Sequence, residues 1–204
     1  MDKNKKVEMF RHNDYRHLMQ VRAIEENSDS GKMIIRGKAI SFDDPTVLFE
    51  YDGVEYKEVI EKGALDEADL SYAYMKYNHS NSIMAMARYK NGTLKIDTNT
   101  GEIEAELADT TAGRDLYTLV KRGDIDKMSF AFTIREESYD KVTHTWNVRK
   151  IDKLYDVAAV EVPAYENTEL FARRYGEVEA SRRAEVEASE KAMVEAKARA
   201  KQRQ

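Results

Sequence analysis

Alternating apolar and polar residues dominate the middle of this 204-residue chain and predict a strand-rich fold. The clearest alternation covers residues 93–98 and 102–107, where apolar side chains fall on one face and charged side chains on the other. Turn residues at Asn91-Gly92 and at 99–101 bound these segments. With a further strand expected at residues 84–89, before the first of these turns, we expect a meander of three strands, of which the last two are half buried.

β-branched and aromatic residues between turn signals predict further strands on both sides of the meander. They are expected at residues 18–24, within 33–49, and at 71–77, 130–135, 145–150 and 156–162. Asp52-Gly53 has the sequence of a hairpin turn. A short helical turn is expected after residues 59–65, and Pro163 should close the last strand.

Two segments have helical character. Residues 110–122 can begin with Thr110 or Thr111 as the N-cap and end at Gly123. Their apolar stripe consists of Ala112, Leu116, Leu119 and Val120. Residues 176–204 combine mixed charge and frequent alanine with few large apolar side chains, which predicts a solvated helix.

These elements predict an α+β fold dominated by strands, with helices packed on it and a charged helix at the C-terminus. The expected organisation is an N-terminal arm over residues 1–30, a folded domain over 31–175 and a helical tail over 176–204. A hydrophobic content of 42% is enough for this chain to bury a core.

Composition excludes several kinds of function. The net charge of −5 gives no basis for electrostatic nucleic-acid binding. No apolar run approaches the roughly 18 to 20 residues of a membrane span, and the first residues lack the apolar stretch of a signal peptide, so we expect a cytosolic protein without membrane contact. Without cysteine there is no thiol catalysis, and no phosphate, dinucleotide or zinc motif is present, so we expect no cofactor and no metal.

One histidine and one serine stand out as candidate catalytic groups. His79 follows an extended segment and lies among small polar residues, where an imidazole stays accessible. Ser129 lies within the aromatic segment 128–134, on the opposite strand face from Phe130 and Phe132. If the fold brings them together, they supply a base and a nucleophile. The alternatives are an idle surface histidine and a serine on the solvent face of a half-buried strand.

The other histidines are weaker candidates. His12 and His17 belong to the N-terminal arm, and His144 is expected in a turn between strands. Two carboxylates, Asp156 and Glu161, lie on an apolar strand, where a charge needs a reason to be near the core. They point to opposite faces, so only one of them can serve a given site.

Six segments are informative through their order and spacing: residues 36–42, 58–65, Asn78-His79, 128–132, 154–160 and Pro163-Ala164. Together they resemble the HK97-type phage prohead (capsid maturation) proteases, a family related to herpesvirus assemblin. The resemblance covers about residues 34–171. The resemblance implies an assemblin-like fold, with a mostly antiparallel, β-barrel-like core and packed helices, and it makes residues 31–175 a serine protease domain.

The resemblance also implies roles for the candidate residues. His79 becomes the general base, Ser129 the nucleophile, and Asp156 the third member of the triad. The family's pattern in the last strand is Leu-x-Glu-Val-Ser, so Asp156 takes the place of the glutamate and Ala158 that of the serine. Glu161 is the reserve for the third member.

The function implied is that of a serine endopeptidase of phage procapsid maturation. Its expected substrates are a scaffold protein or the scaffolding segment of the major capsid protein, and also the protease itself. It would act inside the procapsid, in the host cytoplasm, and self-associate. The alternative is a non-catalytic assembly protein that binds scaffold through its tail.

Overall fold

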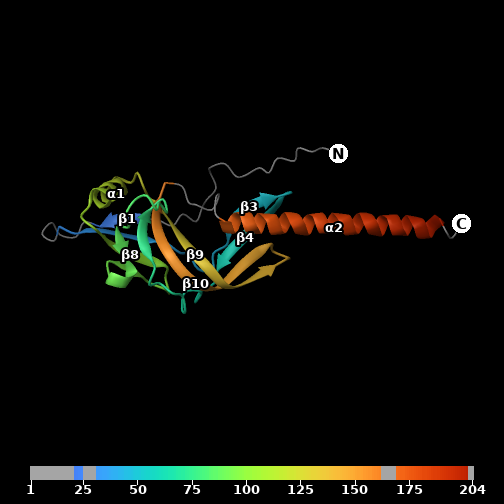
Figure 1. Cartoon of the computed structure of the whole chain (residues 1–204), viewed down its shortest axis with the longest axis horizontal. Helices are drawn as coiled ribbons and strands as arrows, with labels where there is room; N and C mark the ends of the chain where they lie inside the picture. Colours follow the sequence, from blue (N-terminus) through green and yellow to red (C-terminus); the bar gives the residue numbers. More distant parts are fainter. Residues whose placement is uncertain (1–20, 25–30, 162–168, 202–204) are drawn as a thin grey trace. The chain divides into compact units, whose positions relative to one another are not determined.

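The structure is a computed structural model that describes residues 21–24, 31–161 and 169–201. The chain forms two compact units, Met1–Ala164 and Tyr165–Gln204. The first unit contains all described strands and helix α1, and the second contains helix α2 (Figure 1). The α+β class predicted from the sequence is confirmed.

The smaller sheet of the first unit is antiparallel and has the strand order β1-β2-β8-β7. These strands are β1 (Val21–Ile24), β2 (Met33–Lys38), β8 (Glu102–Leu107) and β7 (Leu94–Ile96). Along β8 the burial alternates, with Ile103, Ala105 and Leu107 buried. The predicted half-buried strands β7 and β8 and their antiparallel pairing are therefore confirmed. The predicted three-stranded meander is not, because β6 (Ala87–Arg88) pairs with β5 (Tyr74–Tyr77) in the larger sheet instead of with β7.

Helix α1 (Thr111–Arg122) packs against β1, β2 and β8. The Thr110 hydroxyl caps its first turn by accepting a hydrogen bond from the Gly113 N–H at 3.1 Å. Gly123 ends the helix in a left-handed conformation, with φ at 81°. Both predicted ends are confirmed. They could be predicted because the capping residues, Thr110 and Gly123, directly flank the helix in the sequence.

The larger sheet has the order β3-β4-β10-β5-β6, with β9 paired to β10. Its strands are β3 (Thr46–Tyr51), β4 (Val54–Ile60), β10 (Thr145–Val160), β5 (Tyr74–Tyr77), β6 (Ala87–Arg88) and β9 (Lys127–Asp140). Strands β4 and β5 both run parallel to β10, and the other pairs are antiparallel.

The prediction of a barrel-like core is wrong. Within the described residues the strands make two open sheets and do not close on themselves. Parallel pairing of β10 with β4 and β5 requires crossover connections, which adjacent-strand patterns in the sequence do not reveal. The predicted strand at 84–89 shrinks to β6, because Tyr89–Asn91 form a 3-10 turn (η1) that ends at Gly92.

Strands β9 and β10 form one long, bent hairpin (Figure 1). The two separate strands expected at 145–150 and 156–162 are a single strand up to Val160, and residues 162 and 163 lie outside the described ranges. Register shifts between Val148 and Asp156 explain the error. Three of the four shifts add a residue to β10, and the shift between Lys150 and Ile151 adds Arg135 to β9. None of them ends the pairing, so the alternation of apolar residues is lost while the strand continues.

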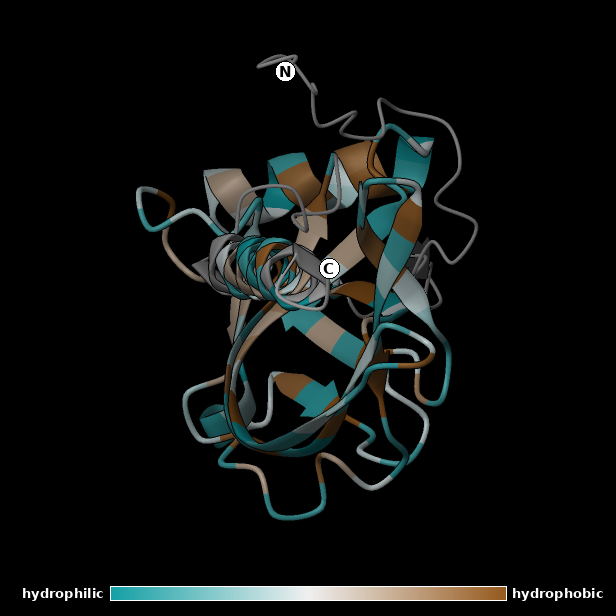
Figure 2. Ribbon diagram, turned by 90° about the vertical axis from the view of Figure 1, so that its right-hand side faces the viewer, coloured by the Kyte–Doolittle hydropathy of each residue, from teal (hydrophilic) through white to brown (hydrophobic). Residues whose placement is uncertain are grey.

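Helix α2 (Glu169–Lys201) begins before the expected start at residue 176. Most of its described side chains are exposed, and in Figure 2 it is coloured mainly as hydrophilic. Ion pairs such as Arg183–Glu179 and Arg199–Glu195 link successive turns. Among the described helices, none is long and apolar enough to span a membrane.

The main core lies on one face of the β9–β10 hairpin. Met128 is fully buried there, and Phe130, Phe132 and Ile134 pack against the same cluster. This confirms the predicted alternation along β9, which leaves Ser129 on the other face. Val157 and Ala159 of β10 also belong to the core cluster, and Ala158 between them does not.

Candidate active site

The face of the larger sheet opposite the core carries two rows of side chains across β5, β10 and β9. The first row consists of Tyr74, Asp156 and Ala131, and the second of Lys76, Ala158 and Ser129. Residues directly opposite each other on paired strands project to the same face. Ser129, Asp156 and Lys76 therefore project from one face of the sheet, although they are far apart in the sequence.

His79 reaches this face from a tight turn that follows β5. The Ser80 N–H donates to the Tyr77 carbonyl at 2.9 Å, and φ is positive at both central residues, 48° at Asn78 and 53° at His79. This is a type I′ turn. Asparagine adopts this conformation readily, whereas for a residue such as histidine it costs roughly 1 to 2 kcal/mol.

The turn is fastened to the end of β10 through Asn78. Its N–H donates to the Ala159 carbonyl at 3.0 Å, and its side-chain oxygen accepts from the Glu161 N–H at 3.1 Å. These two bonds hold the strained turn in place and fix the backbone position from which the His79 side chain extends. Sequence reasoning missed this role of Asn78, although its signal was an asparagine directly before the histidine.

His79 and Asp156 are in direct contact. Nδ1 of the imidazole lies 2.6 Å from Oδ1 of the carboxylate. The Asp156 side chain is only 6% exposed, and that of His79 is 22% exposed. Since an ionised carboxylate can only accept hydrogen bonds, Nδ1 carries the proton and donates it, which leaves Nε2 free to accept one.

Ser129 lies in the adjoining row and is buried, with 6% of its surface exposed. It is therefore not a serine on an open solvent face. Its diagonal neighbour on β10 is Asp156, a relation that places the two backbones about 7 to 8 Å apart. Within residues 31–161 no hydrogen bond joins Ser129 to His79. Bonds between a nucleophile and its base often tighten only in the substrate complex.

The comparisons with known proteins bear on this arrangement. The family model for the Caudovirus prohead serine protease matches residues 18–181. The chain belongs to this family. The match confirms the resemblance seen in the sequence and contains His79, Ser129 and Asp156. Searches of the curated proteins and of the solved structures gave no match.

Membership in the prohead serine protease family makes the chain a member of a serine peptidase family involved in phage capsid maturation. The family description favours the enzyme over the non-catalytic assembly protein considered from the sequence. Among the described residues, no group of three or more His, Cys, Asp or Glu side chains is arranged to hold a metal ion.

Lys76 is a further charged group of this candidate site, and sequence reasoning missed it. Its Nζ lies 3.4 Å from Oδ2 of Asp156 and donates to Oδ1 of Asn81 at 2.8 Å. The lysine thus contacts the carboxylate oxygen that His79 does not use. It also ties the loop that follows His79 back to β5. The available signal was a lysine next to the buried Met75 in a short strand.

The reserve acid and the other histidines lie elsewhere. The carboxylate of Glu161 accepts a hydrogen bond from the Tyr77 hydroxyl, and this bond raises the pKa of Tyr77. His144 lies in the β9–β10 turn, as predicted, with Nδ1 3.2 Å from the Tyr139 hydroxyl. His12 and His17 lie outside the described residues.

Proposed function

We propose that the chain is a serine endopeptidase with Ser129 as nucleophile, His79 as general base and Asp156 as the residue that orients the base. The observation that carries the proposal is the 2.6 Å contact between His79 and Asp156 on the sheet face from which Ser129 projects. A carboxylate, an imidazole and a hydroxyl in this order form the charge arrangement that acyl transfer requires.

The mechanism follows from the positions of the protons. Ser129 Oγ attacks the peptide carbonyl carbon while Nε2 of His79 takes the hydroxyl proton. Asp156 keeps the Nδ1 proton in place and stabilises the imidazolium that forms. The imidazolium then protonates the leaving amine, and the acyl-enzyme remains. Water then attacks this ester while Nε2 of His79 takes a proton from it. The imidazolium returns that proton to Ser129 Oγ as the acid product leaves.

The role we propose is maturation of a phage procapsid. The substrates would be a scaffold protein or the scaffolding segment of the major capsid protein, cut inside the procapsid in the host cytoplasm. Residues 31–175 would form the protease domain, with an assemblin-like arrangement, and copies of the chain would self-associate. The family match over residues 18–181 supports this role.

The chain itself is a further proposed substrate. Helix α2 has few apolar side chains to hold it in place, and Val186, Met193 and Val194 are exposed. A solvated helix frays readily into the extended form that a protease cleaves. Purified protein should lose mass from this region with time, whereas the Ser129→Ala variant should keep it. Equal loss in both would contradict self-cleavage.

The catalytic assignment is tested by covalent labelling with a fluorophosphonate. We expect modification of the unaltered protein at Ser129, located by peptide mass spectrometry, and no modification of Ser129→Ala or His79→Ala. Matched controls are Ser138→Ala, on the same strand, and His144→Asn, in the β9–β10 turn; both should be labelled normally. Labelling of His79→Ala at the normal rate would refute the role of His79, and no labelling of any variant would favour the scaffold-binding protein.

A further inference from the structure

Besides Lys76, Arg88 is a second positively charged residue on the sheet face from which Asp156 and Ser129 project. Arg88 pairs with Tyr74 across β6 and β5, and its guanidinium carbon lies 5.0 Å from the centre of the Tyr74 ring. Among the described residues, no carboxylate lies within ion-pair distance of Arg88. Its Nε is buried and has no hydrogen-bond partner.

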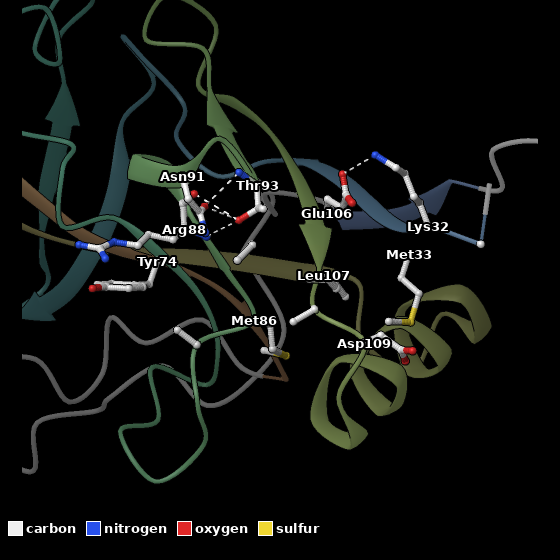
Figure 3. Close-up of a pocket in the computed structure, with 14 residues that line it drawn as sticks. Lys32, Met33, Tyr74, Met86, Arg88, Asn91, Thr93, Glu106, Leu107 and Asp109 are labelled. Carbon is white, nitrogen blue, oxygen red and sulfur yellow. Dashed lines mark hydrogen bonds and ion pairs between the residues drawn. The ribbon is translucent and has the colours of Figure 1, made fainter.

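Arg88 and Tyr74 line one end of a cavity of about 480 Å³ (Figure 3). The other charged residues of this cavity are already paired. At the far end, Lys32 contacts Glu106 at 2.9 Å, and Asp109 pairs with Arg114. Among the described residues that line the cavity, Arg88 is therefore the one positive charge without an ion-pair partner.

The cavity end at Arg88 is connected to the active site by the register of the sheet. Tyr74 pairs with Asp156, and Asp156 pairs with Ala131 on β9, two residues from Ser129. Two strand spacings separate Tyr74 from β9, or roughly 10 Å at about 4.8 Å each. An extended peptide covers this distance with about three residues, at roughly 3.3 Å per residue.

We infer that Arg88 and Tyr74 form a substrate subsite that takes an acidic side chain about three residues from the scissile peptide bond. A carboxylate there would accept hydrogen bonds from the guanidinium in a charge-assisted, bidentate geometry. Lys76 is unsuited to this role because it already contacts Asp156 and Asn81. The inference rests on the proposed function, since a subsite needs a cleavage site beside it.

The test uses a synthetic mixture of random-sequence peptides, with the cleavage products read by mass spectrometry. For the unaltered protein we expect at least tenfold enrichment of Asp and Glu at one position two to four residues from the cut. Arg88→Gln should abolish the enrichment, and Arg88→Glu should replace it with enrichment of Lys and Arg. The control Arg114→Gln, which removes a paired arginine near the cavity, should leave the preference unchanged.

Fluorophosphonate labelling of the same proteins separates the two claims. Arg88→Gln should be labelled at Ser129 at the normal rate, because the probe does not extend to the subsite. Two outcomes overturn the subsite alone, provided that Ser129 is labelled. In the first, the unaltered protein cleaves peptides without preference for acidic residues. In the second, Arg88→Gln keeps the acidic preference. Labelling without cleavage of any peptide also overturns it. Absence of labelling in the unaltered protein removes the proposed function and the subsite with it.

Discussion

Replacing Asp156 by asparagine tests how the proposed base, His79, is oriented. The neighbouring Lys76 restricts the orientation that the asparagine side-chain amide can adopt. The asparagine keeps the shape of the carboxylate but has one oxygen and one NH2 group. Lys76 can only donate hydrogen bonds, so it selects the orientation with the amide oxygen toward its Nζ. The NH2 group then faces Nδ1 of His79. Nδ1 must accept, its proton moves to Nε2, and Nε2 can no longer take the proton of Ser129.

The size of the effect follows from these contacts. Turning the amide over would replace the favourable contact of its oxygen with the Lys76 ammonium, 3.4 Å from Oδ2 in the unaltered protein, by a repulsive one between the NH2 group and the ammonium. We take the cost as that of a lost hydrogen bond to a charged group, about 1.5 to 3 kcal/mol. The productive orientation would then be present in roughly one molecule in ten to one in a hundred. The lost negative charge, which no longer stabilises the imidazolium, lowers the rate further. A total loss of up to about 10⁴ is expected for such a wrong tautomer.

A second substitution separates the effect of the amide's orientation from the effect of the lost carboxylate charge. In the double variant Asp156→Asn with Lys76→Met, the amide is free to turn its oxygen toward His79. Labelling of Ser129 by the fluorophosphonate should therefore be about ten to a hundred times faster than in Asp156→Asn alone, although slower than in the unaltered protein. The control combines Asp156→Asn with Lys57→Met on β4, which should rescue nothing.

Two results would refute this reasoning. If Asp156→Asn is labelled as fast as the unaltered protein, the carboxylate does not orient the base. If the double variant is labelled no faster than Asp156→Asn, Lys76 does not set the orientation of the amide. Thermal unfolding followed by circular dichroism should show the same fold in each variant, so that the rates can be compared.

Two further predictions concern stability. Gly101→Ala should destabilise the protein by more than the roughly 1 to 2 kcal/mol of a left-handed alanine, because a Cβ there would lie 1.9 Å from the Ile40 carbonyl oxygen. Urea unfolding checks this against Gly92→Ala, where φ is similar and no atom lies within 4 Å; equal losses would contradict it. Hydrogen bonding, first from Lys95, lowers the pKa of Glu104 from its usual 4.5, so its stabilising effect is present above that pH and is lost as pH falls through the lowered pKa. Glu104→Gln should therefore be less stable than the unaltered protein at pH 7, and the difference in stability should shrink as the pH falls through the lowered pKa; a constant difference would refute the linkage.

The parts of the fold that the sequence predicts are those with local causes. Helix α1 was predicted with both of its ends, because Thr110 and Gly123 act within one turn of it. Strand β8 was predicted because its alternation faces a single core. The open form of the larger sheet was not predicted, since it depends on β10 pairing with strands about 80 to 90 residues earlier in the chain.

The candidate site also has residues that the sequence predicts and contacts that depend on distant strand pairing. His79, Ser129 and Asp156 were selected from residue type, setting and family resemblance, while their neighbours were not. The contact between His79 and Asp156 depends on the parallel pairing of β5 with β10, which no local pattern encodes. Lys76 was missed for the same reason, since its position beside Asp156 follows from that pairing.

A bulge in β10 links the core to the site. Asp156 is two residues after Leu154, and in a regular strand both would face the core. The register shifts by one residue between them, with Leu154 opposite Phe132 and Asp156 opposite Ala131. The extra residue, Tyr155, is 42% exposed.

The same bulge explains why this strand could not be recognised in the sequence. The core residues Ile151, Leu154 and Val157 are spaced by three, a period typical of helices. Because the bulge changes which face the following residues occupy, Leu154 and Val157 can both enter the core while Asp156 turns toward His79. The irregularity that obscures β10 in the sequence pattern is thus the feature that places the Asp156 carboxylate on the sheet face of the candidate site, as bulges beside active sites commonly do.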